Sequence, residues 1–363
     1  MTIALNNELV VLAREYRNLT QEQLARAIFV SQATIAKIEG GLSTDTPKDV
    51  IERIAKALNF PVDFFFLNEE RFNFGSSSYY YRKKSKISAA ERKHITGLVN
   101  LIRINLKRLL DAVDIETNRE LPSIDIEEYG GDASGVAKAV RAIWSLPDGP
   151  IKNITSLMES AGILIVPCDF GTRYMDATSI HLADIPPIVF INKDLPGDRW
   201  RFTLAHELAH LIMHDIPTET MEDEADAFAG EFLTPSAELR AQFKRLAKIR
   251  IQDLANMKLY WKVSMQSLLV QADNLGFINA NQKRYLWSTI SKLGYRLKEP
   301  NPLPAEKTQN YQNLFSYYKN ELGYSIKEMA QSVKLIPSEF ESLHAVCFPK
   351  PKNQPQTSLR IVR

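Results

Sequence analysis

Residues 206–210 read His-Glu-Leu-Ala-His, with two histidines separated by three residues and a glutamate directly after the first histidine. In an α-helix of 3.6 residues per turn, His206 and His210 lie one turn apart on the same face. Both imidazoles can then bind one tetrahedral Zn²⁺ ion, with Glu207 beside the open coordination position. A carboxylate at that point can take a proton from zinc-bound water. The spacing therefore predicts a hydrolytic zinc site with Glu207 as the catalytic base.

A zinc ion bound by two histidines needs a third protein ligand, and residues 215–231 hold seven acidic and no basic side chains. On a helical projection, Glu224 sits at the edge of an apolar stripe, whereas Glu222, Asp223 and Asp226 point away from it. The stripe consists of Met221, Ala225, Phe228 and Phe232. A carboxylate facing the core is costly unless it is paired or bound to a metal. We therefore expect Glu224 as the third ligand and Asp226 as a hydrogen-bond partner of a ligand.

Two other interpretations stay open for this region. A five-residue His-Glu-x-x-His match also arises by chance in amphipathic helices. Acidic residues such as Glu219 and Glu222 are favoured at a helix start by the helix dipole alone. His214 follows His210 by four residues, about 6 Å along the helix, which is too far to join the same ion. We expect it to hydrogen-bond nearby or to serve as a C-terminal histidine of the helix.

Residues 201–214, together with residues 222–229 and 232–235, resemble the ImmA/IrrE family of metallopeptidases. The family pattern joins HExxH to a downstream Glu-Ala-Asp/Asn-x-Phe-Ala in which the glutamate is the third zinc ligand. This resemblance implies His206, His210 and Glu224 as ligands and Glu207 as the base. Ala209 stands where the family often has glycine, which leaves the four chemical positions intact.

The resemblance covers roughly residues 135–300 and implies a small sheet whose edge strand precedes the active helix. Residues 187–192 fit that edge, to which a peptide substrate could add by backbone hydrogen bonding. The residue that stabilises an oxyanion is not assigned. Tyr174, His181 and Arg199 are candidates, each with an equally good structural role.

Residues 20–41 have the spacing of a helix-turn-helix, with Ala25 small where two helices must cross. Residues 5–67 resemble the Xre/Cro class of DNA-binding domains. That resemblance implies a DNA operator as partner and a set of residues that face the major groove or the phosphate backbone. The set comprises Gln21 at the phosphate and Gln32, Ala33, Thr34 and Lys37 at the groove.

Charge both supports and opposes this DNA-binding role. Residues 1–70 hold 7 Lys/Arg against 10 Asp/Glu, which is unusual for tight operator binding and would also suit a protein-interaction module. Residues 71–110 hold 10 Lys/Arg against Glu91 alone. This basic belt suits phosphate contact, although a solvated helix face would look the same.

Periodicity predicts an α+β fold that is mostly α. A five-helix N-terminal helix-turn-helix domain is expected over residues 5–17, 21–29, 32–39, 47–58 and 61–67. A long helix at residues 88–113 could mediate homodimerisation, and further helices are expected at residues 134–145, 150–161, 198–214 and 221–232. Residues 162–167 and 187–191 read as strands, with residues 174–181 able to pair between them.

We therefore divide the chain into five parts. These are a DNA-binding domain (1–70), a basic linker with the long helix (71–133), a zincin-like peptidase domain with a small sheet (134–240), a helical C-terminal region (241–347) and a disordered tail (348–363). Residues 254–275 and 325–344 also have a helix-turn-helix rhythm. Neither has a recognisable base-reading set, so we interpret both as packing or regulatory helices.

The bulk composition is that of a globular protein, with 45% hydrophobic and 24% charged residues in a chain of 363. No apolar run reaches the roughly 18 residues needed to span a bilayer. The N-terminus lacks a signal-like stretch, and two cysteines do not suggest a disulfide framework. We expect a cytoplasmic protein without a membrane partner.

Together these features predict a transcriptional regulator with zinc endopeptidase activity. Its expected substrate is a repressor or antitoxin-like protein, cleaved in trans in a stress or mobile-element response. Two alternatives remain: a transcription factor whose peptidase fold only senses a ligand, and the toxin of a toxin–antitoxin pair.

Overall fold

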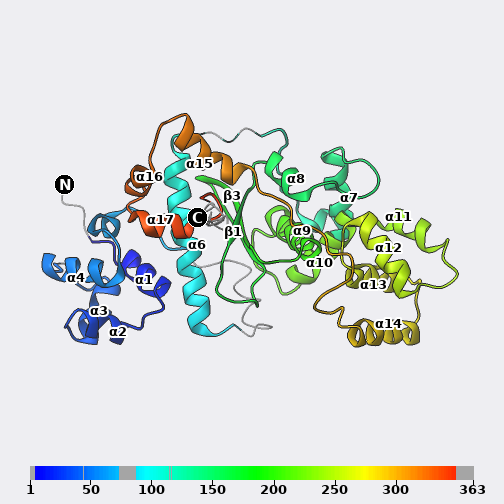
Figure 1. The fold of residues 1–363 in the computed structure, drawn as a ribbon, viewed down its shortest axis with the longest axis horizontal. Helices are drawn as coiled ribbons and strands as arrows, with labels where there is room; N and C mark the ends of the chain where they lie inside the picture. Colours follow the sequence, from blue (N-terminus) through cyan, green and yellow to red (C-terminus); the bar gives the residue numbers. More distant parts are fainter. Residues whose placement is uncertain (1–4, 44, 73–86, 114, 116, 349–363) are drawn as a thin grey trace, which may run out of the picture.

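The computed structural model describes residues 5–43, 45–72, 87–113, 115 and 117–348. Residues 73–86 of the expected basic linker, with four members of the basic belt (Arg82, Lys83, Lys84 and Lys86), and the tail from residue 349 onward lie outside these residues. The described elements form an arch, with the N-terminal helices at one end and α14 (Ala280–Lys292) at the other (Figure 1). No helix among the described residues has both the length and the apolar composition needed to cross a bilayer.

The N-terminal domain, here called the head, contains the five expected short helices, the last of which is a 3-10 helix. Thr20 caps the second helix in a capping box with Gln23, and Ser31 caps the third, as their side-chain oxygens accept from exposed backbone N–H groups. Leu24, Ile35 and other apolar side chains fill the core between the helices. The elements are α1 (Asn7–Tyr16), α2 (Gln21–Ala27), α3 (Gln32–Glu39), α4 (Lys48–Leu58) and η1 (Val62–Phe66).

The long helix α6 (Ala89–Leu110) is a core element rather than an exposed dimerisation surface. It packs against α1, where the ring of His94 stacks on Tyr16 with centroids 5.6 Å apart. Gly97 allows this approach, because a Cβ there would lie 2.8 Å from the backbone nitrogen of Tyr16. Further along, the apolar residues of α6 join one face of the sheet and the C-terminal helices in a single core. Because the apolar residues of α6 are buried within the chain, they do not support the expected role of this helix in homodimerisation.

The sheet has the strand order β1-β3-β2, formed by β1 (Leu164–Cys168), β2 (Ala177–Leu182) and β3 (Ile185–Asn192). β3 pairs parallel with β1 and antiparallel with β2. Two expectations were wrong: residues 174–181 do not lie between the other strands, and residues 187–192 form the centre rather than the edge. The physical reason is the buried run from Ile188 to Ile191, which is covered on both faces and suits a central strand.

Alternate residues of the strands divide between two cores. Val166, Ile188 and Phe190 face α6, whereas Ile165 and Val189 face the helices on the other side of the sheet. Those helices are α7 (Ala133–Ile143), α8 (Ile154–Ser160), α9 (Gly197–Met213) and α10 (Met221–Leu233), preceded by the short 3-10 helix η2 (Ile126–Tyr129).

The C-terminal region is not the single unit that was expected. Its first part extends the apolar core that α7 to α10 form on one side of the sheet. Its last part packs with α6 and the head on the other side. Glu339 accepts hydrogen bonds from Tyr16 at 2.5 Å and from Arg17 at 2.7 Å, which fixes the head to the body. The first part comprises α11 (Ser236–Phe243), α12 (Ile251–Trp261), α13 (Met265–Asn274) and α14, and the last part α15 (Asn310–Asn320), α16 (Ile326–Ser332) and α17 (Pro337–Leu343).

Candidate metal centre

Helix α9 places the two histidines of the HExxH sequence as their spacing requires. The Nε2 atoms of His206 and His210 lie 3.1 Å apart. The helix itself is held between the sheet and α10, with Leu204, Leu208 and Ala209 completely buried. The buried apolar face fixes the helix, so the two imidazoles leave it on one side and converge.

The acidic residue at these imidazoles is Glu222, not Glu224. The carboxylate oxygens of Glu222 lie 3.2 Å from Nε2 of His206 and 3.4 Å from Nε2 of His210. The three side chains form the group of potential metal ligands found among the described residues. Glu222 shares a helix face with Ala225 and Ala229, both completely buried. We expected Glu224 because it borders the stripe of large apolar residues, but the side of α10 that faces the histidines is the one with Glu222.

The spacing of these three groups fits a zinc ion. In a tetrahedral site with bonds of about 2.0–2.1 Å, ligand atoms lie about 3.4 Å apart. The observed separations between the two imidazole nitrogens and the carboxylate, 3.1, 3.2 and 3.4 Å, are close to that value. The donor set of two imidazoles and one carboxylate is also one that zinc accepts while keeping a fourth position open. Residues His206, His210 and Glu222 would hold the ion.

Asp226 and Glu224 contact the histidines rather than the position of the metal. Asp226 lies 2.9 Å from Nδ1 of His206, which leaves Nε2 of that ring for the metal. Nδ1 of His210 lies 2.9 Å from Nδ1 of His214, whose Nε2 is 3.0 Å from Glu224. If the Nδ1–H of His210 donates to His214, then the Nε2–H of His214 donates to Glu224. Each metal-facing histidine is thus oriented by hydrogen bonds that end on a carboxylate, Asp226 for His206 and Glu224, through His214, for His210. Such bonds are the usual support for metal-binding imidazoles.

The charges of the cluster are strongly coupled. Burial disfavours the charged form of His206, but the hydrogen bonds that the ring donates to Asp226 and Glu222 outweigh it and raise the pKa of His206 to about 10. Burial likewise opposes ionisation of Glu222, yet hydrogen bonds from His206 and His210 hold its pKa at about 2. The site thus binds positive charge in the form of protons, for which a divalent cation would compete.

Glu207 points from α9 to strand β2. Its Oε2 accepts a hydrogen bond from Ser179 Oγ at 2.7 Å, and the residue is buried. β2 lies at one side of the described three-stranded sheet, next to β3. No feature of the sequence singled out Ser179 as a partner of Glu207.

The three candidates for oxyanion stabilisation do not converge on the cluster. Arg199 is held by Asp176 at 2.6 Å. Tyr174 lies under the guanidinium of Arg173 and is exposed. His181, also exposed, lines a hollow of about 600 Å³ with Asp184 at the far end of β2.

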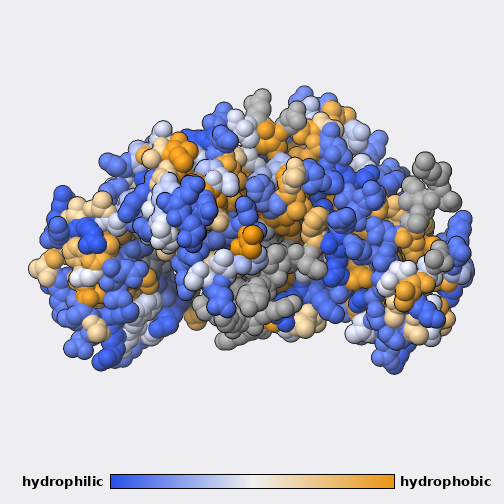
Figure 2. All heavy atoms as spheres, turned by 180° about the vertical axis from the view of Figure 1, so that it is seen from behind, coloured by the Kyte–Doolittle hydropathy of each residue, from blue (hydrophilic) through white to orange (hydrophobic). Residues whose placement is uncertain are grey.

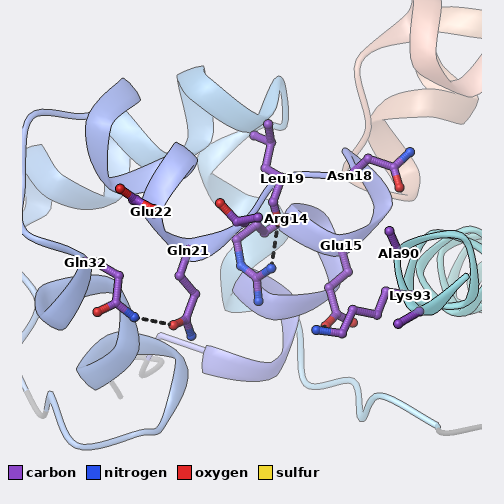
Figure 3. Close-up of a pocket in the computed structure, with 11 residues that line it drawn as sticks. Arg14, Glu15, Asn18, Leu19, Gln21, Glu22, Gln32, Ala90 and Lys93 are labelled. Atoms are coloured by element: carbon purple, nitrogen blue, oxygen red, sulfur yellow. Dashed lines mark hydrogen bonds and ion pairs between the residues drawn. The ribbon is translucent and has the colours of Figure 1, made fainter.

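In the head, the expected DNA-facing residues lie on one side of α3. Gln32, Ala33 and Lys37 are exposed, whereas Thr34 is half-buried with its hydroxyl 2.8 Å from Ser31. Gln32 donates to the side chain of Gln21 at 2.7 Å (Figure 3). Gln21 in turn donates to Glu39, which is buried and paired with Arg14. This network fixes the two glutamines at the mouth of a hollow of about 850 Å³ between the head and the start of α6.

The described part of the basic belt is mostly engaged inside the protein. Arg71 and Lys93 pair with Glu15, and Arg103 with Glu69. Burial lowers the pKa of Arg103, against the attraction of Glu69. Further along α6, Lys107 pairs with Glu69 and Asp184, and Arg108 donates to the carbonyl of Ser332. These five cations bind the head to α6 and the body, so they supply little free charge for phosphate contact.

Comparison with known families agrees with both parts of the structure. Residues 158–272 match the Peptidase_M78 family, described as the IrrE N-terminal-like domain. Residues 12–65 match a helix-turn-helix family. No curated protein matches the chain. The chain therefore joins an N-terminal helix-turn-helix domain to a metallopeptidase-family domain of the IrrE N-terminal-like type.

Proposed function

We propose that the protein is a DNA-binding regulator that cleaves a protein substrate at a zinc site. The observation that carries this proposal is the convergence of His206, His210 and Glu222 on the helix that also carries the buried Glu207. Bound zinc would supply Lewis acidity to a peptide carbonyl and activate water. Every other part of the reaction is assigned to side chains and backbone of this chain.

The substrate would bind as an extended peptide with its scissile bond next to Glu207 and the histidines of α9. Glu207 would take the proton of the attacking water and deliver it to the leaving amine. Ser179 would keep the carboxylate of Glu207 in the orientation needed for that transfer. Asp226 and the His214–Glu224 pair would orient the histidines.

The head supports binding to an operator through Gln21, Gln32, Ala33, Thr34 and Lys37. The Gln21–Gln32 pair is a fixed donor and acceptor set, suitable for an adenine edge and a neighbouring phosphate. DNA binding in turn favours a cytoplasmic location and a DNA-associated substrate such as a repressor. Cleavage in trans of a repressor or antitoxin-like protein, in a stress or mobile-element response, is the form of activity we propose.

The experiment compares the proteomes of cells that carry the wild-type chain and the Glu207→Gln variant. A protein cut only in the wild-type cells, and cut again by the purified wild-type protein, would support the proposal. Equal zinc content in the two proteins would show that Glu207→Gln removes the catalytic base and leaves the metal site intact.

A transcription factor with a non-catalytic sensor domain predicts another outcome. Operator binding would be unaffected by Glu207→Gln, and no protein would be cut in either strain. Growth arrest on expression that disappears in Glu207→Ala would instead favour a toxin. The proposal fails if no protein differs between the two proteomes under any condition that changes operator occupancy.

A further inference from the structure

A second part of the chain carries as large an excess of positive charge as the basic belt. Residues 236–298, which span α11 to α14 and are here called the basic lobe, hold 12 Lys/Arg against three Asp/Glu. The other 300 residues hold 33 Lys/Arg against 40 Asp/Glu. A chain whose formal net charge is only +2 thus holds its excess of positive charge in two segments, the basic belt and this lobe.

Ten of the twelve cations of the lobe are on its surface. Lys258 is buried between Asp198 and Glu299, and Lys262 is half-buried. The other ten are exposed, namely Arg240, Lys244, Arg245, Lys248, Arg250, Lys283, Arg284, Lys292, Arg296 and Lys298. Of the three acids, Asp273 pairs with Lys283, and Asp253 accepts from the backbone N–H of Arg250.

Contacts within the lobe bring its charged segments together. Gln282, at the start of α14, donates to the carbonyl of Ile249, which joins the segment of Lys248 and Arg250 to that of Lys283 and Arg284. On α14, Arg284 and Trp287 line an open hollow of about 560 Å³ with Arg296, whose guanidinium lies 5.1 Å from the Trp287 ring centroid. Lys283, Arg284 and Arg296 thus gather around the ring of Trp287, with the segment of Lys248 and Arg250 bonded to the start of the same helix.

The lobe does not repeat the base-reading geometry of the head. α12 and α13 meet through Lys262 at φ 57°, as α2 and α3 meet through Phe29 at φ 58°. However, the N-terminus of α13 is blocked, because Glu299 accepts from the backbone N–H groups of Met265 and Gln266. Met265 is also completely buried. The surface can offer charge to a backbone, but α13 cannot present side chains to base edges.

We propose that the basic lobe binds the phosphate backbone of duplex DNA, without regard to sequence, next to the site read by the head. This rests on the DNA-binding part of the proposed function. The head has a net negative charge, and five of the six described belt cations are engaged in internal contacts. Phosphate contacts dominate the affinity of many DNA-binding proteins, so an operator complex would gain from cations in another part of the chain. The head and α14 lie at opposite ends of the arch and both along its lower edge (Figures 1 and 2), so one duplex could meet both.

The test measures the salt dependence of binding of the full-length protein to a fluorescent duplex of random sequence. The lobe variant Lys248→Gln/Arg284→Gln is compared with Lys319→Gln/Lys327→Gln, which removes the same charge from exposed positions in α15 and α16. Two lost phosphate contacts should reduce the slope of log affinity against log salt by about 1.8 and weaken binding on the order of tenfold. The control should keep the wild-type slope.

Equal slopes for the two variants, with unchanged thermal unfolding, would overturn the proposal. It would also be overturned if the lobe variant lost binding to poly-glutamate while its DNA slope stayed wild-type, because the partner would then be an acidic protein. Failure of the head as a reader looks different. It would abolish discrimination between operator and random duplex and leave the lobe-dependent salt slope in place.

Discussion

Ser179 on the edge strand β2 donates a hydrogen bond to Glu207 on α9, with Oγ 2.7 Å from Oε2. The bond joins β2 to the carboxylate that would take the proton of the attacking water. A substrate that shifted β2 would thereby shift the base as well. We therefore regard Ser179 as a positioning residue.

Ser179→Ala should lower kcat on the cleaved protein while changing KM little. A hydrogen bond to a charged group contributes about 1.5–3 kcal/mol, so the decrease should be about tenfold or more. Ser179→Thr keeps the hydroxyl and should restore most of the rate. Zinc content must stay at the wild-type level in both variants. Loss of rate with Ser179→Thr equal to that with Ser179→Ala would remove the positioning role.

Gly97 provides a test of how firmly the head is fixed to the body. Glycine to alanine inside a helix normally stabilises a protein by up to about 1 kcal/mol. Gly97→Ala should do the opposite, because its Cβ would lie 2.8 Å from the backbone nitrogen of Tyr16 and force α1 away from α6. Hydrogen exchange should become faster in α1 and at Tyr16, while zinc binding remains. A more stable variant with unchanged exchange would show that the two helices are not in close contact.

His344 predicts an acid-sensitive contact between the C-terminal helices and α6. It is completely buried, 2.6 Å from the Tyr311 hydroxyl and 3.2 Å from Asn105. Burial lowers its pKa to about 3, against about 6.5 in an unfolded chain. Between these values the unfolded chain binds the extra proton. The free energy of unfolding should therefore fall as the pH drops below about 6.5, by up to about 1.4 kcal/mol per pH unit.

Urea unfolding at several pH values checks this prediction. The wild-type chain should lose more stability between neutral and acidic pH than His344→Gln, although the variant starts from a lower value. Parallel pH dependences for the two proteins would mean that His344 is not the responsible group.

The sequence was sufficient for features that depend on a single helix or turn. His206, Glu207 and His210 lie on one helix, so their relation follows from helical geometry alone. The five short helices of the head are equally local. The positions of these residues and helices were predicted correctly because nothing outside their own segment decides them.

Features that depend on how two elements pack were missed. Choosing between Glu222 and Glu224 requires the side of α10 that faces α9, and that side carries Ala225 rather than a large apolar residue. The order of the strands did leave a signal, since the unbroken apolar run at residues 188–191 suits a central strand. The hydrogen bond from Ser179 to Glu207 joins elements 28 residues apart and left no trace in the spacing.

The most direct test of the account is zinc content and affinity in four proteins: the wild type, His206→Ala, Glu222→Gln and Glu224→Gln. The account predicts about one zinc per wild-type chain and little in His206→Ala or Glu222→Gln. Glu224→Gln should keep its zinc, with affinity about 10- to 100-fold weaker because only the support of His210 is lost. Zinc retained in Glu222→Gln but lost in Glu224→Gln would contradict the assignment of the third ligand, and no zinc in the wild-type protein would contradict the metal centre itself.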